Sequence, residues 1–315
     1  MPGHHHHHHH HIEDAGDARV GWAIAVNLAL TVAQVVGGVV SGSLALIADA
    51  LHNFSDAMAL VIAFAARRIA RRPRDTAMTF GYGRAELVAA LVNYTTLILI
   101  GLYLVYEAIQ RFASPEPVAG WIIVAVAGLA LVVDLATALL TYRLSKESMN
   151  IRAAFLHNLA DAMGSVAVIL AGSLVLLFGW HIVDPVATLL IAGYILWQSF
   201  AEIGPVIRIL MLGSPPDIDT GAVLETVRGV DGVADIHHAH LWQMDEHRNA
   251  LDAHIVVAEG RWGEADAIKA DIKASLSDRF GIGHATLELE CARHACHERT
   301  LIGGAGDSGP ERAHG

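Results

Sequence analysis

Six long apolar segments alternate with short polar ones over the first two thirds of the chain. A helix needs about 20 apolar residues to cross roughly 30 Å of hydrocarbon, and each of these segments has that length. The pattern places them near residues 21–40, 44–66, 85–110, 119–142, 153–178 and 182–204. The sequence therefore predicts an α-helical membrane domain with six transmembrane helices.

The basic residues are distributed unevenly among the loops, which predicts the orientation. Lys and Arg in short loops stay on the cytoplasmic side. They occur in the second and fourth connections, as Arg67, Arg68, Arg71, Arg72, Arg74, Arg143, Lys146 and Arg152. The first, third and fifth connections (Ser41–Ser43, Ser114–Ala119 and Gly179–Asp184) contain none, although Arg111 ends the third helix. We therefore expect both termini in the cytoplasm, and the first 20 residues contain no apolar stretch that would suggest a cleavable signal peptide.

The pattern changes after Leu212, where alternating and helical periods replace the long apolar runs. They predict a C-terminal α+β domain of order αββαβ, similar to metallochaperone and ferredoxin-like folds, with elements at 219–229, 234–243, 249–257, 263–280 and 284–290. We expect four parts: a His-rich arm or tag (1–18), the transmembrane domain (19–211), the soluble domain (212–292) and a flexible tail (293–315). The run His4–His11 fits either a purification tag or a natural metal-collecting arm.

Composition supports a membrane protein with a cationic partner. With 54% hydrophobic and 17% charged residues and a mean hydropathy of +0.44, the chain is too apolar for a wholly soluble protein. The net charge is −11, and residues 212–315 contain eighteen acidic against nine basic side chains. This excess of acid argues against nucleic acid as a partner. The two cysteines, Cys291 and Cys296, cannot form a disulfide framework.

Ionisable residues interrupt the second apolar segment. Asp49, His52, Asn53 and Asp56 stand where apolar residues would insert most easily. Each ionisable group at the bilayer centre costs about 2.5–3.5 kcal/mol on insertion scales, which makes a functional role the default hypothesis. His52 and Asp56 are four residues apart and so lie on one helical face.

The fifth segment repeats this spacing with His157 and Asp161. Two imidazoles and two carboxylates form a ligand set that tetrahedral Zn²⁺ accepts, although imidazole also suits Co, Ni, Fe and Cu. Asp49 is either a partner that orients His52, a further ligand, or a protonated structural acid. Asn27, Gln34 and Asp134 in the other segments are typical of interhelical hydrogen bonding, with direct metal contact as the alternative.

These motifs together resemble the cation diffusion facilitator family, in its zinc-transporter-like branch. The resemblance rests on the two HxxxD motifs, on FGYGRAE at Phe80–Glu86, on HxxHLW at His237–Trp242 and on the six-segment topology. It implies a homodimer that exports divalent metal, with Zn²⁺ as transported and regulatory ion, in exchange for protons. It also implies that residues 212–292 bind metal and hold the dimer together. A multi-pass protein of the bacterial inner (cytoplasmic) membrane is expected, and no enzyme.

The resemblance also implies metal ligands in the soluble domain, at His237, His240, His254 and His284, with Glu290 as an additional ligand. His238 stands where many relatives have Asp, so either member of the pair His237 and His238 could face the metal. Strand alternation alone would place His238 and His240 on one face and His237 on the other. The tail offers soft ligands in Cys291, His294, Cys296 and His297.

A second loop site is doubtful. Relatives that bind metal between the second and third segments use His where this chain has Tyr82, although Asp75 remains.

Two alternatives to zinc export stay open, and a third is disfavoured. The same fold could export Co²⁺, Ni²⁺, Fe²⁺ or Cd²⁺, or the protein could be a membrane metal sensor that moves no ion. An intramembrane hydrolase is disfavoured because no Ser or Cys nucleophile accompanies the HxxxD motifs and HExxH is absent. The absence of a GxxxxGK[ST] motif agrees with transport that uses no ATP.

Overall fold

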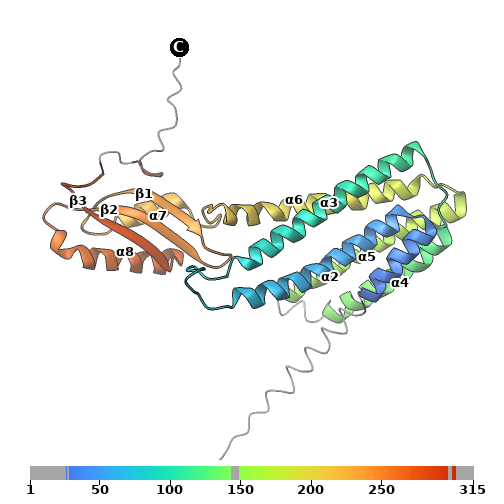
Figure 1. Cartoon of the computed structure of the whole chain (residues 1–315), viewed down its shortest axis with the longest axis horizontal. Helices are drawn as coiled ribbons and strands as arrows, with labels where there is room; N and C mark the ends of the chain where they lie inside the picture. Colours follow the sequence, from blue (N-terminus) through green and yellow to red (C-terminus); the bar gives the residue numbers. More distant parts are fainter. Residues whose placement is uncertain (1–25, 27, 143–148, 297–299, 303–315) are drawn as a thin grey trace, which may run out of the picture. The chain divides into compact units, whose positions relative to one another are not determined.

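The computed structural model describes residues 26, 28–142, 149–296 and 300–302 (Figure 1). Within its helices, the side chains of residues 60, 140, 141, 149–154 and 157 lie outside the description. The chain divides into two compact units. The first consists of residues up to 66 together with 89–203, and the second of 67–88 together with 204 to the end.

The first unit is built from long apolar helices. Five described helices are long and apolar enough to cross a membrane: α2 (Leu44–Ala70), α3 (Ala85–Ala113), α4 (Gly120–Tyr142), α5 (Met149–Phe178) and α6 (Val183–Leu210). A shorter apolar helix, Leu28–Ser41, precedes them. The predicted helical membrane fold is confirmed. The first predicted segment begins outside the described residues, so only its part from residue 28 can be compared.

Small residues allow the helices of this unit to pack closely. A Cβ atom on Gly120 would lie 2.6 Å from the Gly172 carbonyl oxygen, and one on Gly172 would lie 2.7 Å from Ile123. Helices α4 and α5 therefore approach each other closely at these glycines. Such contacts are usual between membrane helices, because lipid is as apolar as the helix surface and association depends on close packing. The buried core of this region consists of Ala45, Leu46, Val118, Ile123, Ala127, Val168, Ala171, Val175 and Ala187.

The outward surface of the same unit is apolar. Large side chains more than 60% exposed include Phe64, Leu99, Leu177, Leu190 and Trp197. Exposed apolar area on this scale is not compatible with water and is expected of a lipid-facing surface. The apolar helices and this surface agree with a multi-pass membrane protein.

A buried carboxylate holds the start of α2. Asp184 of α6 is fully buried and accepts hydrogen bonds from the Leu44 amide (2.9 Å), the Ala45 amide (3.4 Å) and the Ser43 hydroxyl. The first amides of a helix have no partner inside the helix and carry partial positive charge, so a carboxylate stabilises them. The preceding turn is fixed as well, because Arg111 donates to the Gly42 carbonyl oxygen (2.6 Å).

The second unit contains the predicted αββαβ domain. Its elements are α7 (Thr220–Arg228), β1 (Val233–Gln243), β2 (Asn249–Val257), a 3-10 turn (Trp262–Glu264), α8 (Ala265–Phe280) and β3 (His284–Cys291). The three-stranded sheet has the order β1-β2-β3, in which β2 pairs antiparallel with β1 and parallel with β3. The predicted order of elements is confirmed.

Alternation along the strands separates a core face from a ligand-bearing face. Leu251, Ala253, Ile255 and Val257 of β2 pack with Ile268, Ile272 and Leu276 of α8 and with Val223, Leu224 and Val227 of α7. Asp252 and His254 fall between these core positions and so point to the other face. In β3, Leu287 and Leu289 pack against the core, whereas Glu288 and Glu290 alternate with them. The sheet therefore carries helices on one face and acidic and imidazole groups on the other.

We expect Asp184→Ala to lower the thermal stability of the detergent-solubilised protein. It removes the acceptor of two buried amides, and an unsatisfied buried donor costs about 1–3 kcal/mol. Asp184→Asn, which keeps one acceptor oxygen, should lose less. Thermal unfolding followed by intrinsic fluorescence measures the effect, with the exposed Glu202 on the same helix, as Glu202→Ala, for the control. Equal melting temperatures for the two alanine variants would contradict the assigned role.

Candidate metal centres

Three potential metal ligands meet between α2 and α5. His52 Nε2 lies 3.6 Å from Asp56 Oδ2 on the same helix and 3.6 Å from Asp161 Oδ1 on α5. The three side chains are 12%, 23% and 10% exposed, and their ligand atoms all lie within 4.8 Å of one another. The four-residue spacing of His52 and Asp56 places both on one face of α2. These are three of the four residues that the sequence predicts for the membrane group.

The distances fit ligands around an ion better than direct hydrogen bonds. An N–H···O hydrogen bond spans about 2.7–3.2 Å between heavy atoms. Two ligands that are each 2.0–2.1 Å from a tetrahedral Zn²⁺ are about 3.4 Å apart. The 3.6 Å separations around His52 Nε2 are close to that value. The geometry is therefore compatible with a small divalent cation held by imidazole and carboxylate.

The fourth predicted ligand cannot be placed. His157 belongs to α5, but its side chain lies outside the described residues. Its assignment stays a prediction that rests on its spacing from Asp161.

A separate polar network holds Asp49. The Gln34 amide nitrogen donates to Asp49 Oδ2 (2.6 Å), and the Asn53 amide nitrogen donates to Gln34 Oε1 (3.0 Å). All three side chains are at least 95% buried. Asp49 is not part of the described group within 4.8 Å around His52. Gln34 thus joins the helix Leu28–Ser41 to α2 by hydrogen bonds, and the Asp49 carboxylate has the Gln34 amide as its donor.

A similar contact joins α4 to α5. The buried Ser165 hydroxyl donates to Asp134 Oδ2 (3.2 Å). Of the polar residues expected to join helices, Gln34 and Asp134 therefore do so, and Asn27 lies outside the described residues.

In the soluble domain, a bulge in β1 brings two consecutive histidines to one side. The pairing register shifts between His237 and His240, and His238 has a φ of +48°. Successive core residues of a regular strand are two positions apart, but Ile236 and Ala239 are three positions apart. The rings of His237 and His238 both remain outside the core, 4.9 Å apart between centroids. The alternation expected from sequence is therefore wrong here, because a bulge adds one residue and changes its phase.

These two rings join His254 and Cys296. Ring centroids of His237 and His238 lie 5.3 and 5.0 Å from that of His254, which pairs with His237 across the strands. Cys296 Sγ lies 3.8 Å from His254 Nδ1. The four residues offer ligand atoms that all lie within 4.8 Å of one another. Three nitrogens and one sulfur form a set that Zn²⁺ accepts.

An acidic group adjoins these residues. His254 Nδ1 lies 2.8 Å from Glu290 Oε1, and His254 Nε2 lies 3.3 Å from Glu288 Oε2. Burial alone would raise the pKa of Glu290, but hydrogen bonds from the amide and thiol of Cys296 and from His254 bring this pKa below its ordinary value. Burial lowers the pKa of His237, and the neighbouring His238 and His254 act in the same direction. An ionised carboxylate and a neutral imidazole are the forms that bind metal.

The remaining predicted ligands lie apart from both groups. His240 is exposed and pairs with Asp252, and His284 is exposed with its ring 6.5 Å from that of Phe80. Cys291 Sγ lies 3.2 Å from His294 Nδ1. None of these is in a described group of three or more close ligands. Their assignment as ligands stays a prediction, whereas Glu290, His238 and Cys296 lie in such groups.

Asp75 stabilises the conformation of the loop between α2 and α3. Asp75 accepts hydrogen bonds from the Ala77 amide (2.9 Å), the Met78 amide (2.7 Å) and the Tyr82 hydroxyl (2.6 Å). The Tyr82 contact lowers the pKa of Asp75, and the Met78 amide adds to the effect. The carboxylate thus serves as an acceptor for its own loop, which agrees with the doubt about a metal site there.

The FGYGRAE motif attaches this loop to β1. The Arg84 guanidinium lies 5.6 Å from the centroid of the Trp242 ring and donates to the Met244 carbonyl oxygen (3.1 Å). The Phe80 ring lies edge-on to the Trp242 ring, 6.0 Å away between centroids. The motif therefore positions the loop by cation–π, aromatic and hydrogen-bonding contacts.

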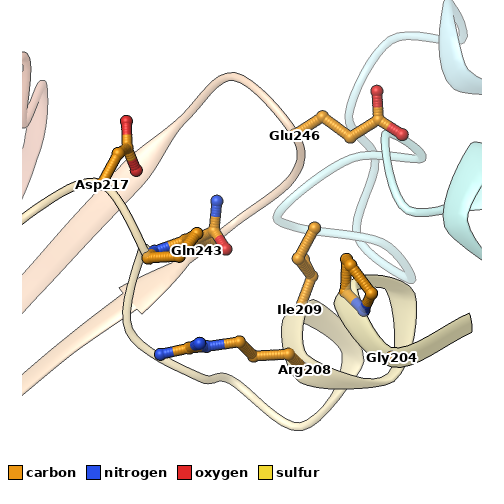
Figure 2. Close-up of a pocket in the computed structure, with 8 residues that line it drawn as sticks. Gly204, Arg208, Ile209, Asp217, Gln243 and Glu246 are labelled. Atoms are coloured by element: carbon orange, nitrogen blue, oxygen red, sulfur yellow. The ribbon is translucent and has the colours of Figure 1, made fainter. Parts of the chain in front are cut away.

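The second unit also has a cavity of about 570 Å³, shown in Figure 2. Its lining combines a cation, two acids and apolar groups: Gly204, Pro205, Arg208, Ile209, Pro216, Asp217, Gln243 and Glu246. It contains neither His nor Cys, and Arg208 is tied to the Ser214 carbonyl oxygen (3.0 Å). The cavity is distinct from both ligand groups.

Comparison with known proteins identifies relatives over nearly the whole chain. Residues 22–211 match the family described as cation efflux transmembrane domain, and residues 215–291 match the cytoplasmic domain of cation efflux proteins. A cadmium, cobalt and zinc/H(+)-K(+) antiporter of Bacillus velezensis is 37% identical, over 85% of this chain and 86% of its own length.

Two further relatives are similar at the same level. The zinc transporter ZitB of Pectobacterium atrosepticum is 38% identical over 89% of this chain and 88% of its own. The metal cation efflux system protein CzcD of Cupriavidus metallidurans is 35% identical over 86% and 85%. A solved structure, the metal-bound C-terminal domain of a CzcD transporter, matches 23% of this chain and 99% of its own, with 25% identity and a TM-score of 0.22.

We expect Tyr82→Phe to raise the pKa of Asp75 toward its ordinary value, because the Tyr82 hydroxyl is the main contact that lowers it. A lowered carboxyl pKa stabilises the folded loop at pH values above the ordinary pKa of the group, and this stabilisation disappears as the pH falls through the folded-state pKa. In the variant the two pKa values lie closer together, so the stabilisation of the loop is smaller. Carboxyl-carbon NMR with labelled Asp measures the titration, and Tyr106→Phe in α3 is the control. An unchanged Asp75 midpoint would contradict the prediction.

Proposed function

Because the chain belongs to the cation efflux family, the cation diffusion facilitators, we propose that it exports divalent metal ions, Zn²⁺ foremost, from the cytoplasm in exchange for protons. Matches to both family domains, together covering residues 22–211 and 215–291, support metal efflux. The names of the relatives, which include zinc, cadmium and cobalt, support the choice of substrate.

The observation that carries the proposal is the meeting of His52, Asp56 and Asp161 within membrane-spanning helices. Their ligand atoms lie within 4.8 Å of one another. Two carboxylates and an imidazole in hydrocarbon are costly unless a function requires them. A divalent cation compensates their negative charge, so the group is most stable when its substrate is bound. We assign His157 as the fourth ligand, from its spacing to Asp161.

Proton exchange follows from the chemistry of the same ligands. Zn²⁺ binds neutral imidazole and ionised carboxylate, so protons and metal compete for His52, Asp56 and Asp161. An ion that arrives from the cytoplasm displaces protons, and protonation from a more acidic outer phase releases the ion. Transport of this kind uses the proton gradient as its energy source. The polar network of Gln34, Asp49 and Asn53 holds the helices in place beside it.

The rest of the protein is assigned in the same way. We place it in the cytoplasmic membrane as a homodimer with both termini inside, and we assign residues 212–292 to regulatory metal binding and dimerisation. The acidic and imidazole face of the sheet supports metal binding there. A sensor that moves no ion would need only that domain, and the ligand group in the membrane favours transport.

We expect Asp161→Asn to reduce Zn²⁺ uptake into proteoliposomes at least about tenfold, since the substrate loses a charged ligand. Glu202→Gln, an exposed residue of α6, should behave like the wild type. An imposed proton gradient should accelerate uptake in the wild type. Unimpaired uptake in Asp161→Asn would remove the proposed site, and uptake that is indifferent to the gradient would remove the proton coupling.

Selectivity tests the role of His52. We expect His52→Asp to lower the preference for Zn²⁺ over Mn²⁺, because it exchanges imidazole for an oxygen ligand that suits harder ions. Competition transport with both ions, together with Cd²⁺ and Co²⁺, gives the ratio. If His52→Asp leaves the ratio as in the wild type, His52 does not contact the substrate.

A further inference from the structure

The cavity of Figure 2 combines three charged side chains with apolar surface. Arg208 comes from α6, Asp217 from the segment that follows it, and Glu246 from the hairpin between β1 and β2. Pro205 and Ile209 contribute apolar surface. The volume of about 570 Å³ is within the range of small-molecule sites. The size and the charges indicate a ligand that carries charges of both signs.

The polar groups that line the cavity can bind a ligand. Gln243 is 9% exposed, and within the described part of the chain its side-chain amide forms no hydrogen bond. The carboxylates of Asp217 and Glu246 likewise have no hydrogen bond or ion pair with another described residue. A buried amide without a partner is costly unless a bound group satisfies it. The one described hydrogen bond of the Arg208 guanidinium runs from Nε to the Ser214 carbonyl oxygen (3.0 Å), so its terminal nitrogens can donate to a ligand.

Other contacts hold the walls of the cavity in place without using these groups. The backbone amide of Gln243 donates to the Gly213 carbonyl oxygen (3.2 Å), which joins the end of β1 to the segment after α6. In the hairpin, Asp245 accepts a hydrogen bond from Arg248 Nε (2.6 Å). The acid next to Glu246 is therefore used within the protein, whereas Glu246 itself is exposed. A preformed site loses less conformational freedom when it binds a ligand.

The part of α6 that lines the cavity lies at the depth of lipid headgroups. Helix α6 has 28 residues and is therefore about 42 Å long at 1.5 Å per residue, whereas about 20 residues cross the hydrocarbon. The apolar segment ends near residue 204, so the last turns, Gly204–Leu210, extend into the headgroup layer. Beside Arg208 in sequence, Ile207 is 39% exposed and Met211 is 78% exposed, as suits contact with acyl chains. A ligand at this depth is supplied most directly by the membrane.

We propose that this cavity binds the headgroup of a phospholipid that carries a primary ammonium beside its phosphate, as in phosphatidylethanolamine. The Arg208 guanidinium pairs with the phosphate, whose oxygens match its planar fork of donors. The ammonium has three N–H donors, and the acceptors for them are the carboxylates of Asp217 and Glu246 and the amide oxygen of Gln243. This lipid site goes beyond the proposed transport function and does not depend on it.

Other occupants fit the cavity less well. A divalent metal ion would face the Arg208 cation, and Asp217 and Glu246 belong to no described group of three or more close metal ligands. A headgroup with only negative charge would face two carboxylates. A quaternary ammonium, as in phosphatidylcholine, has no N–H group to donate. The lining therefore favours a zwitterion with a primary ammonium.

Lipid titration of the full-length protein in detergent, followed by native mass spectrometry, tests the choice of headgroup. Dioleoyl phosphatidylethanolamine should bind about tenfold or more tightly than phosphatidylcholine or phosphatidylglycerol with the same acyl chains. Soluble phosphoethanolamine has a similar headgroup without acyl chains and should bind about tenfold or more weakly than the lipid. Equal affinities for the different lipids would overturn the proposal. Equal affinities for the lipid and for phosphoethanolamine would overturn the membrane as the source of the ligand.

A double substitution tests whether the lipid binds in this cavity. Asp217→Asn with Glu246→Gln keeps the size of both side chains and removes the charges that face the ammonium. The preference for phosphatidylethanolamine over phosphatidylcholine should therefore fall about tenfold or more. Asp271→Asn with Asp278→Asn changes two exposed acids of α8 that do not line the cavity, and this control should keep the preference. If the cavity variant retains the preference of the wild type, the lipid binds elsewhere and the proposal is wrong.

Discussion

The constraint on which the membrane unit depends is that polar groups in hydrocarbon must find partners inside the protein. Gln34 donates to Asp49 and accepts from Asn53, and Asp184 accepts the first amides of α2. Each of these contacts joins two segments and therefore fixes a helix as well as satisfying a group. Against this background, the imidazole and carboxylates at His52 lie at distances that suit an ion rather than each other.

In the soluble domain, strand alternation and register bring the ionisable side chains together. Alternation along β2 and β3 puts aliphatic residues on the helix-covered face and His254, Glu288 and Glu290 on the other. Parallel pairing of β2 with β3 places His254 opposite Glu288. Potential ligands from two strands therefore meet because of the register alone, without any contribution from a loop. The bulge of β1 then adds imidazoles to a surface that is already acidic.

Most of the fold could be predicted from the sequence because its signals are local. Apolar runs define α2 to α6, and period-two alternation defines β2 at 249–257, which the structure reproduces. The pairing of His52 with Asp161 could be predicted because repeated HxxxD motifs share a chemistry. The bulge at His238 and the position of Cys296 could not, since both depend on contacts of β1 with residues 300–301, some sixty positions away in sequence. No local propensity encodes such a contact.

The two groups of potential ligands differ in the donor atoms that they offer, and the proposed transport function accounts for the difference. A substrate site must release its ion in every cycle, and imidazole with carboxylate allows this because protons displace the metal readily. A site with a thiolate holds soft ions more firmly, which would stop a transport cycle but suits an ion that stays in place. Sulfur is accordingly absent from the described group at His52 and present at Cys296. In the proposed assignment, ligand type therefore distinguishes the transported ion, which must leave, from a regulatory ion, which can stay.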